Sequence, residues 1–247
     1  MSRMKSYMEV PAVIEGHNGT IGTTQEGLTE YSQNLIWDTI NAVGAATKVQ
    51  LTSSSAADAA AGTGAQKIEI IGCDINGNPI SEVVTLNGQA YVESALSYYR
   101  VFGAAVEEAG SGRVNAGDIH IIKTGTGGTL TAGVPATLTS GWVKIPVGLV
   151  ESFSGMCIVP PNKSLRAVRL EVVSGAQGAV VLIFTRNLSI TKAPLVPRGR
   201  FLVGANQAIN FNLTNLGLMF SAGTQIELKA SGLAASANVW AKLTLGH

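Results

Sequence analysis

Short runs in which hydrophobic and polar residues alternate cover most of the chain from residue 66 onward. Two of them, 66–75 and 79–87, are rich in β-branched residues and have Asn76-Gly77 between them. Alternation with a period of two is typical of half-buried strands, and Asn-Gly favours a tight turn because both residues tolerate positive φ. The pattern therefore predicts a β-hairpin over residues 66–87.

Further runs of the same kind follow, and Gly, Pro, Asn or Ser separates nearly all of them. They cover 89–94, 97–110, 117–125, 141–148, 150–160, 164–175, 178–187, 199–204, 207–213, 224–231 and 238–246. No amphipathic pattern of helical period competes with them. Many short strands at this spacing predict an all-β fold, built from antiparallel β-sandwich or jelly-roll-like units.

Residues 1–45 show no sustained period, and we expect an extended N-terminal arm there. Its large apolar residues would be the anchors that dock on a neighbour or on the protein's own body: Tyr31, Leu35, Ile36 and Trp37. The glycine-rich stretch 124–141 reads as a connector. We therefore predict an N-terminal β unit over 46–141, connector included, and a C-terminal jelly-roll-like sandwich over 142–247.

Charged residues make up only 13% of the chain, against about 25% in ordinary globular proteins. Hydrophobic residues make up 46%, the mean hydropathy is +0.27 and the formal net charge is +1. A lone soluble domain usually carries more surface charge, so we expect a multimer or a member of a lattice. The alternative is a monomer covered by Ser, Thr, Asn and Gly.

Composition also argues against several partners. Without a basic stripe the chain has nothing to displace counterions from phosphates, so we expect no nucleic acid partner. The longest apolar run, 178–184, is far shorter than the ~20 residues of a membrane span. The opening residues lack the apolar core of a signal peptide, and two cysteines cannot form a disulfide framework. We therefore expect synthesis in a cytosol and no membrane anchor.

The stretch 61–88 mixes glycines with spaced acids, so it could be a phosphate loop, a calcium loop or plain β structure. Its GTGAQK run lacks the spacing of a phosphate-binding loop, and no helix follows it. The run that contains Asp74, Asn76, Asn78 and Glu82 also differs from a calcium-binding EF-hand loop, because its glycine and its glutamate are at the wrong positions. The hairpin accounts for the same residues on conformational grounds, and we favour it.

Nucleophilic catalysis has no better support. His120 alternates with isoleucines in a strand pattern, which predicts a solvent-facing or interface position, and Cys157 reads as a small buried residue. Glu107 and Glu108 are adjacent on a strand and point to opposite faces. The run LVPRGR (195–200) looks like a thrombin recognition site, but we interpret it as a loop. We expect no enzyme, no metal and no cofactor.

Residues 53–88 and 98–121 resemble a family of virion structural proteins of tailed bacteriophages. The positions that carry the resemblance are Asp58, Gly62–Ala65, Gly72, Asp74, Asn76, Ile80, Glu82, Val84–Gly88, Tyr99-Arg100, Gly110-Ser111, Asn115, Gly117 and Ile119. Residues 36–38 and 158–175 are similar to looser family features. The chain departs from the family at IWDTINAVG (36–44), where IWD-G-G is common, and at Pro161-Asn162, where Ala-Gly is common.

The resemblance implies a particle component assembled in the host bacterial cytoplasm. We expect a capsid decoration (cement) protein, a homotrimer that clasps the major capsid protein or other virion proteins through residues 1–45. The alternative is a tail, connector or fibre-base protein of the same virion. A third possibility is adhesion to host-surface glycans through the C-terminal unit.

Overall fold

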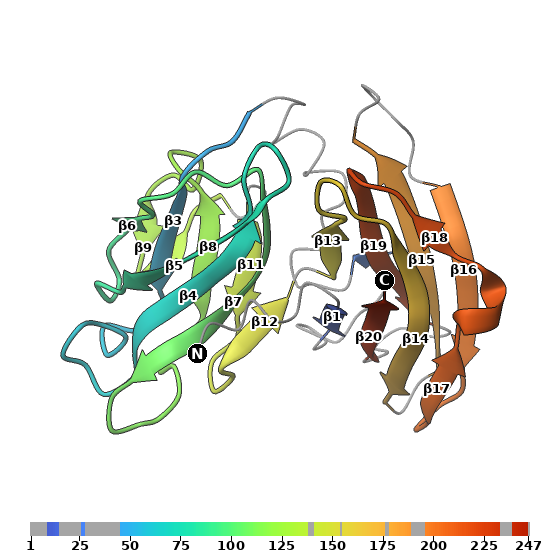
Figure 1. The fold of residues 1–247 in the computed structure, drawn as a ribbon. Coiled ribbons are helices and arrows are strands. Elements are labelled where there is room, and N and C mark those ends of the chain that lie inside the picture. The colour runs from blue at the N-terminus through green and yellow to red at the C-terminus, as the bar shows by residue number, and fades with distance from the viewer. Residues whose placement is uncertain are drawn as a thin grey trace. The chain divides into compact units, whose positions relative to one another are not determined.

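A computed structural model describes residues 9–14, 26–27, 45–137, 141–153, 155–175, 178–188, 196–232 and 239–246 (Figure 1). The chain divides into two compact units. We call residues 35–153 the central unit, and residues 1–34 together with 154–247 the terminal unit. Both are built from antiparallel strands, which confirms the predicted all-β class.

The central unit contains two four-stranded antiparallel sheets. One has the order β11 (Gly141–Ile145), β8 (Ile119–Lys123), β3 (Val49–Ser53), β6 (Val92–Glu93). The other has the order β12 (Glu151–Phe153), β7 (Arg100–Ala109), β4 (Ala65–Cys73), β5 (Pro79–Thr85). Their core contains fully buried aliphatic side chains from both sheets, among them Leu51, Ile68, Ile70, Ile119 and Ile121.

The stretch that the sequence predicts to be a connector folds onto the central unit. It forms the two-stranded ribbon β9 (Leu130–Thr131) and β10 (Val134–Pro135). The Thr52 hydroxyl donates to the Gly133 carbonyl over 3.1 Å, and Gln89 Nε2 donates to the Ala132 carbonyl over 3.2 Å. These side chains hold the ribbon in place without any apolar run of its own.

The strands after the ribbon also belong to the central unit. β11 pairs with β8, with Val143 opposite Ile121, and β12 pairs with β7, with Phe153 opposite Gly103. The boundary between the units therefore lies at 153/154, whereas the sequence pattern places the second unit's start at 142. Pairing across the sheet, which the local pattern does not reveal, assigns these residues.

The terminal unit is a second sandwich. One sheet has the order β1 (Glu9–Ile14), β20 (Val239–Gly246), β14 (Leu165–Ser174), β17 (Ala208–Asn212), and β18 (Met219–Phe220) also pairs with β14. The other has the order β13 (Met156–Ile158), β19 (Thr224–Gly232), β15 (Ala179–Asn187), β16 (Val196–Val203), and β2 (Glu26–Gly27) also pairs with β19.

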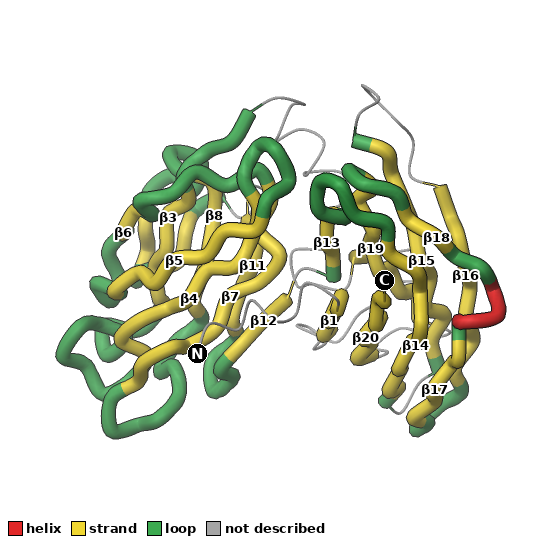
Figure 2. Tube along the Cα trace, in the orientation of Figure 1, coloured by secondary structure: helices red, strands yellow, loops and turns green. Residues whose placement is uncertain are grey.

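Strict alternation builds the core of the terminal unit. Along β20, the side chains of Val239, Ala241, Leu243 and Leu245 are buried, whereas the residues between them are partly exposed. They pack with inward side chains of β14, β15 and β19 in one hydrophobic cluster. A single 3-10 turn, η3 (Thr214–Leu216), joins β17 to β18 and is the red segment in Figure 2.

Two short pieces of the predicted arm are described, and both pair within the terminal unit. Residues 9–14 pair with β20 along their whole length, from Glu9 opposite Thr244 to Ile14 opposite Val239. Residues 26–27 pair with β19. The proposed anchors Tyr31, Leu35, Ile36 and Trp37 lie outside the described residues, so their docking role stays a prediction.

Candidate functional site

The hairpin predicted over residues 66–87 is present as β4 and β5, but its turn differs from the expected one. Gly77 has a φ of +80°, whereas Asn76 is not among the residues with positive φ. The Gly77 N–H donates to the Asp74 carbonyl over 3.1 Å, which makes a three-residue loop with glycine in the left-handed position. The Asn-Gly pair alone does not specify this turn type.

Asp74 explains the turn. Its Oδ1 accepts hydrogen bonds from the backbone N–H groups of Asn76 and Asn78 at 2.9 and 2.8 Å. Its Oδ2 accepts one from Asn78 Nδ2 at 3.0 Å. Aspartate often holds a turn in this way, through the amides two residues and more ahead. The carboxylate that a calcium loop would need is thus engaged by the turn itself.

Asp58 is a buried hub of the central unit, and none of its surface is exposed. Its Oδ1 accepts from the N–H groups of Ala65 and Ala116 at 2.7 and 2.8 Å. Its Oδ2 accepts from the Gly117 N–H at 2.9 Å and from the Ser53 hydroxyl at 2.5 Å. One carboxylate thereby joins the end of β3, the start of β4 and the loop that leads into β8.

Gly64 shows why the turn beside this hub needs a residue without a side chain. A Cβ at this position would lie 2.1 Å from Asp58 Oδ1 and 2.9 Å from the Cβ of Ala116. The close approach lets the N–H of the next residue, Ala65, reach the carboxylate. The GTGA run is therefore a packing requirement of the hub rather than a phosphate loop.

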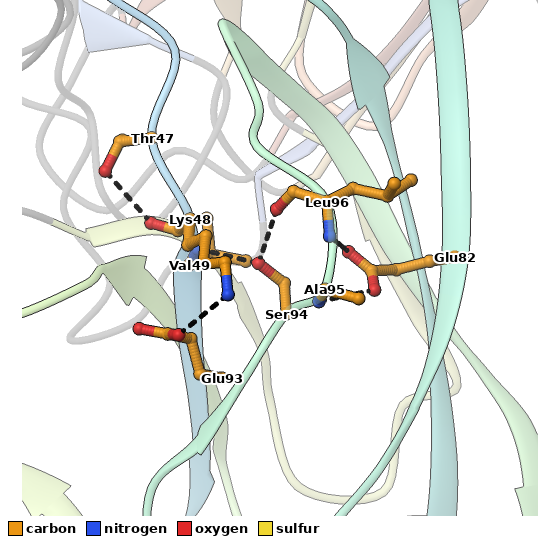
Figure 3. A network of polar contacts seen from close by, with 8 residues as sticks. All are labelled: Thr47, Lys48, Val49, Glu82, Glu93, Ser94, Ala95 and Leu96. Atoms are coloured by element: carbon orange, nitrogen blue, oxygen red, sulfur yellow. Dashed lines mark hydrogen bonds and ion pairs between the residues drawn. The ribbon is translucent and has the colours of Figure 1, made fainter.

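Glu82 is a third structural carboxylate, and Figure 3 shows it beside residues 94–96. Its Oε2 accepts from the Ala95 N–H at 2.8 Å, and its Oε1 accepts from the Leu96 N–H at 3.1 Å and from the Tyr98 hydroxyl at 3.0 Å. Burial and the nearby Glu82 charge raise the pKa of Tyr98, so its hydroxyl stays a donor.

Ser94 continues this network to the neighbouring strand β3, as Figure 3 also shows. Its hydroxyl accepts from the Val49 N–H at 2.9 Å and donates to the Leu96 carbonyl at 2.8 Å. Lys48 and Glu93 form an exposed ion pair beside it, with 3.1 Å between Nζ and Oε2. The network fixes the short strand β6 against β3.

His120 is buried within the chain, with 3% of its surface exposed, so the predicted solvent-facing or interface position is wrong. It lies opposite Thr52 on one neighbouring strand and Lys144 on the other. Lys144 Nζ lies 2.8 Å from Asp118 Oδ2, and the Val147 N–H donates to Asp118 Oδ1 over 2.8 Å. Its neighbours Thr52 and Lys144 are buried as well, so this face of the sheet is covered and alternation does not place His120 in solvent.

The pKa of Asp118 is lower than usual. Partial burial by itself would raise it, but the hydrogen bonds from Lys144 and from the Val147 N–H outweigh that effect. Lys144 is 5% exposed at its side chain, so its ammonium depends on this carboxylate for compensation. Asp118 thus holds β11, through Lys144, and the β11–β12 connection, through the Val147 N–H, beside the start of β8.

Cys73 and Cys157 are both buried, and neither forms a disulfide. Burial raises the pKa of Cys73 to about 12, although the neighbouring Arg100 lowers it in part. A thiol with that pKa is almost entirely protonated at neutral pH and is a poor nucleophile. Within the described residues, no group of three His, Cys, Asp or Glu side chains is arranged to hold a metal ion.

The described segments also include no helix that is long and apolar enough to cross a membrane. Large apolar side chains are nonetheless exposed on both units. They are Ile75, Val83, Leu96, Val147 and Val150 in the central unit, and Val173, Val196, Leu202, Leu216 and Met219 in the terminal unit. Sequence reasoning did not identify these positions. For those in strands, alternation does not say which face of the strand is covered, and the others lie in turns and loops, where no period applies.

Comparisons with known proteins give only weak matches. No protein-family model and no curated protein sequence matches the chain. A structure of infectious bursal disease virus strain Gx is 10% identical over 81% of this chain, with a TM-score of 0.19. The crystal structure of that virus's VP2 subviral particle is also 10% identical over 81%, with a TM-score of 0.15.

The chain spans about half the length of these viral proteins, 54% and 55%. The structures thus give a weak similarity to viral capsid proteins and nothing specific to bacteriophages. TM-scores this low do not establish a common fold, so a functional argument has to rest on the chain's own residues.

Proposed function

We propose that the protein is a structural component of a bacteriophage virion, and specifically a decoration protein on the outer face of the capsid. One observation carries the proposal: the acidic residues that carry the resemblance to phage virion proteins have structural roles. Asp58, Asp74 and Glu82 bind backbone groups of the central unit, as the residues of a rigid building block would. Low overall charge and exposed apolar side chains suit a protein that works in contact with others.

The mechanism is stabilisation by binding. A protein that contacts neighbouring subunits of an assembled shell, but not the separated subunits, lowers the free energy of the shell by mass action. Two disulfide-free sandwiches supply the contact surfaces, and the parts of residues 1–45 outside β1 and β2 supply the proposed clasp to the major capsid protein. Synthesis and assembly take place in the host cytoplasm, and the mature location is the virion.

Cryo-electron microscopy of the intact phage particle tests this assignment. The two sandwiches, fitted as separate bodies, should account for density on the outer surface of the capsid. Density for them in the tail, connector or fibre base contradicts the decoration role and places the protein among tail components. A particle that contains neither, and from which mass spectrometry recovers no peptides of the chain, contradicts a virion role altogether.

Removal of residues 1–40 tests the clasp. The truncated protein also loses β1 and β2, so its folding must be checked first by circular dichroism. If it folds and no longer binds shells that lack the protein, the clasp is supported. If the folded truncated protein binds these shells as well as the full chain does, the arm is not the clasp.

A further inference from the structure

The longest stretch of the chain without a charged residue or histidine is 201–226. At the chain's average charge content, its 26 residues would carry about three charges. Most of the stretch is nevertheless on the surface, because residues 205–208, 214–217 and 221–222 are all exposed. A soluble surface normally includes many charges, so an exposed segment without any is typical of the centre of an interface.

This charge-free segment forms one edge of a sheet. β17 pairs with β14 on one side, with Asn210 opposite Glu171, and no described strand pairs with its other side. Along β17, Ala208, Asn210 and Asn212 are exposed, whereas Ile209 and Phe211 are half-buried and pack on the core. The register between β14 and β17 runs without a bulge, and β17 contains no proline.

The opposite sheet ends in an edge that is protected. β16 contains Pro197, which has no N–H to donate, and two exposed arginines, Arg198 and Arg200. Its register with β15 also skips one residue, since Ile183 lies opposite Gly199 but Phe184 lies opposite Pro197. Proline, positive charge and a bulge are the means by which proteins prevent strand addition at an edge. β17 has none of them.

We propose that β17 pairs antiparallel with β17 of a second copy of this chain, which joins two sheets into one. An uncharged edge is best complemented by an equally uncharged strand, and a second copy presents the same five residues. Antiparallel pairing of identical strands is two-fold symmetric and closed, as isologous contacts are. In a register centred on Asn210, Ala208 of each copy lies opposite Asn212 of the other.

The loop after β17 enlarges the contact. η3 and β18 follow directly. The exposed fraction is 57% for Leu216 in η3 and 59% for Met219 in β18. In the antiparallel pair, this loop of one copy lies beyond the start of β17 in the other, next to its exposed residues Asn206 and Gln207. The contact is two-fold, so it differs from any three-fold contact that builds a trimer, and it does not depend on the virion assignment.

The test is the mass of the full chain in solution. Analytical ultracentrifugation at micromolar concentrations should show a reversible dimer. If another contact already builds an oligomer, it should show that oligomer in reversible association with further copies of itself. Lysine at Ala208, Asn210 and Asn212 together puts like charges opposite each other, and it should weaken this contact by about 100-fold or more. Because all three side chains are exposed, the circular dichroism spectrum of the variant should match that of the wild type. Its unfolding midpoint should fall only by the loss of one exposed hydrogen bond, from the Thr214 N–H to Asn212 Oδ1.

Two controls separate strand pairing from a general effect of charge. Leu202→Lys adds one positive charge at an exposed position on the protected β16 edge, and should leave self-association unchanged. A second triple variant, with aspartate at 208, 210 and 212, should also fail to pair through β17 when it is alone in solution. Mixing the lysine and aspartate variants should restore a one-to-one pair.

Three results would overturn the proposal. The first is a wild-type chain that stays monomeric, which would mean that the edge pairs with a strand of a different protein. The second is self-association of the lysine variant as strong as that of the wild type. The third is a mixture of the two charged variants that fails to pair. Each can occur whether or not the chain is found in a virion, so failure here and failure of the virion assignment are distinguishable.

Discussion

The two units are both antiparallel sandwiches, but they are held together by different means. In the central unit, buried acids and amides cross-link loops that are distant in sequence: Asp58 binds donors at 53, 65, 116 and 117. In the terminal unit, one apolar cluster fills the core, and its members alternate with partly or fully exposed positions along β14 and β20. A strand pattern alone therefore accounts for the terminal unit better than for the central one.

The largest effect is expected from Asp58→Ala. It leaves three N–H groups, two of them buried, and one buried hydroxyl without their acceptor, which should lower the free energy of unfolding by about 3–5 kcal/mol. Amide hydrogen exchange should accelerate in peptides of the central unit and remain unchanged in peptides of the terminal unit. Equal acceleration in both units would show that the hub does not act locally.

Asp74→Ala is the matched control for that variant. It removes the same carboxylate from an exposed hairpin turn, where water can replace the lost acceptor, and should reduce the free energy of unfolding by about 1 kcal/mol. Urea unfolding of both variants gives the difference. If Asp74→Ala is as damaging as Asp58→Ala, burial is not the reason for the importance of Asp58.

Leu243→Ala should destabilise the terminal unit and leave the central unit unchanged, the reverse of Asp58→Ala. Leu243 is fully buried in β20 opposite Leu170, so the variant creates a cavity and should reduce stability by about 2–4 kcal/mol. Hydrogen exchange should accelerate in the terminal unit. Met at this position retains most of the volume and should cost less than Ala, and a loss of equal size would argue against a packing origin.

A smaller, pH-dependent effect is expected from Asp118. Its pKa in the folded protein lies below the ordinary value of about 3.9, so its contribution to stability is present above that pH and is lost as the pH falls. The unfolding midpoint of the wild type should therefore decrease more steeply below pH 5 than that of Asp118→Asn. Parallel curves would mean that the Lys144–Asp118 pair contributes nothing to the acid response.

The smallest effect concerns the thiols. With a pKa of about 12, Cys73 should not react with a thiol reagent at pH 8 while the protein is folded. Cys157, which is 4% exposed, should be equally protected. Labelling followed by mass spectrometry should detect both only in urea, and rapid labelling of the folded chain would place a thiol at the surface.

The sequence predicts the strands well because their periodicity is local. Residues 66–87 form the expected hairpin, and the all-β class is confirmed. The details that fail depend on contacts between distant residues. The turn type follows from the Asp74 side chain, the buried position of His120 depends on what covers its strand, and β11 joins the central unit through its pairing with β8.

For the candidate site, the sequence could argue against binding loops but could not predict the buried Asp58 hub. Spacing argued against a phosphate loop and a calcium loop, and the structure places Gly64 and Asp74 in packing and turn roles. Nothing in the local pattern indicates that Asp58 collects four donors, because these come from residues up to 59 positions away. Its appearance in the family resemblance was the only signal for it.

The pairing of β1 with β20 affects the order in which the protein can fold. Residues 9–14 emerge first from the ribosome among the described strands, and their partner at 239–246 emerges last. At ~5–20 residues per second, the first strand waits on the order of ten seconds or more for its neighbour, while the central unit already has all its strands. The terminal unit can therefore be completed only after residues 239–246 have emerged, and a nascent chain stalled before residue 239 should hold one folded sandwich and one unfinished sheet.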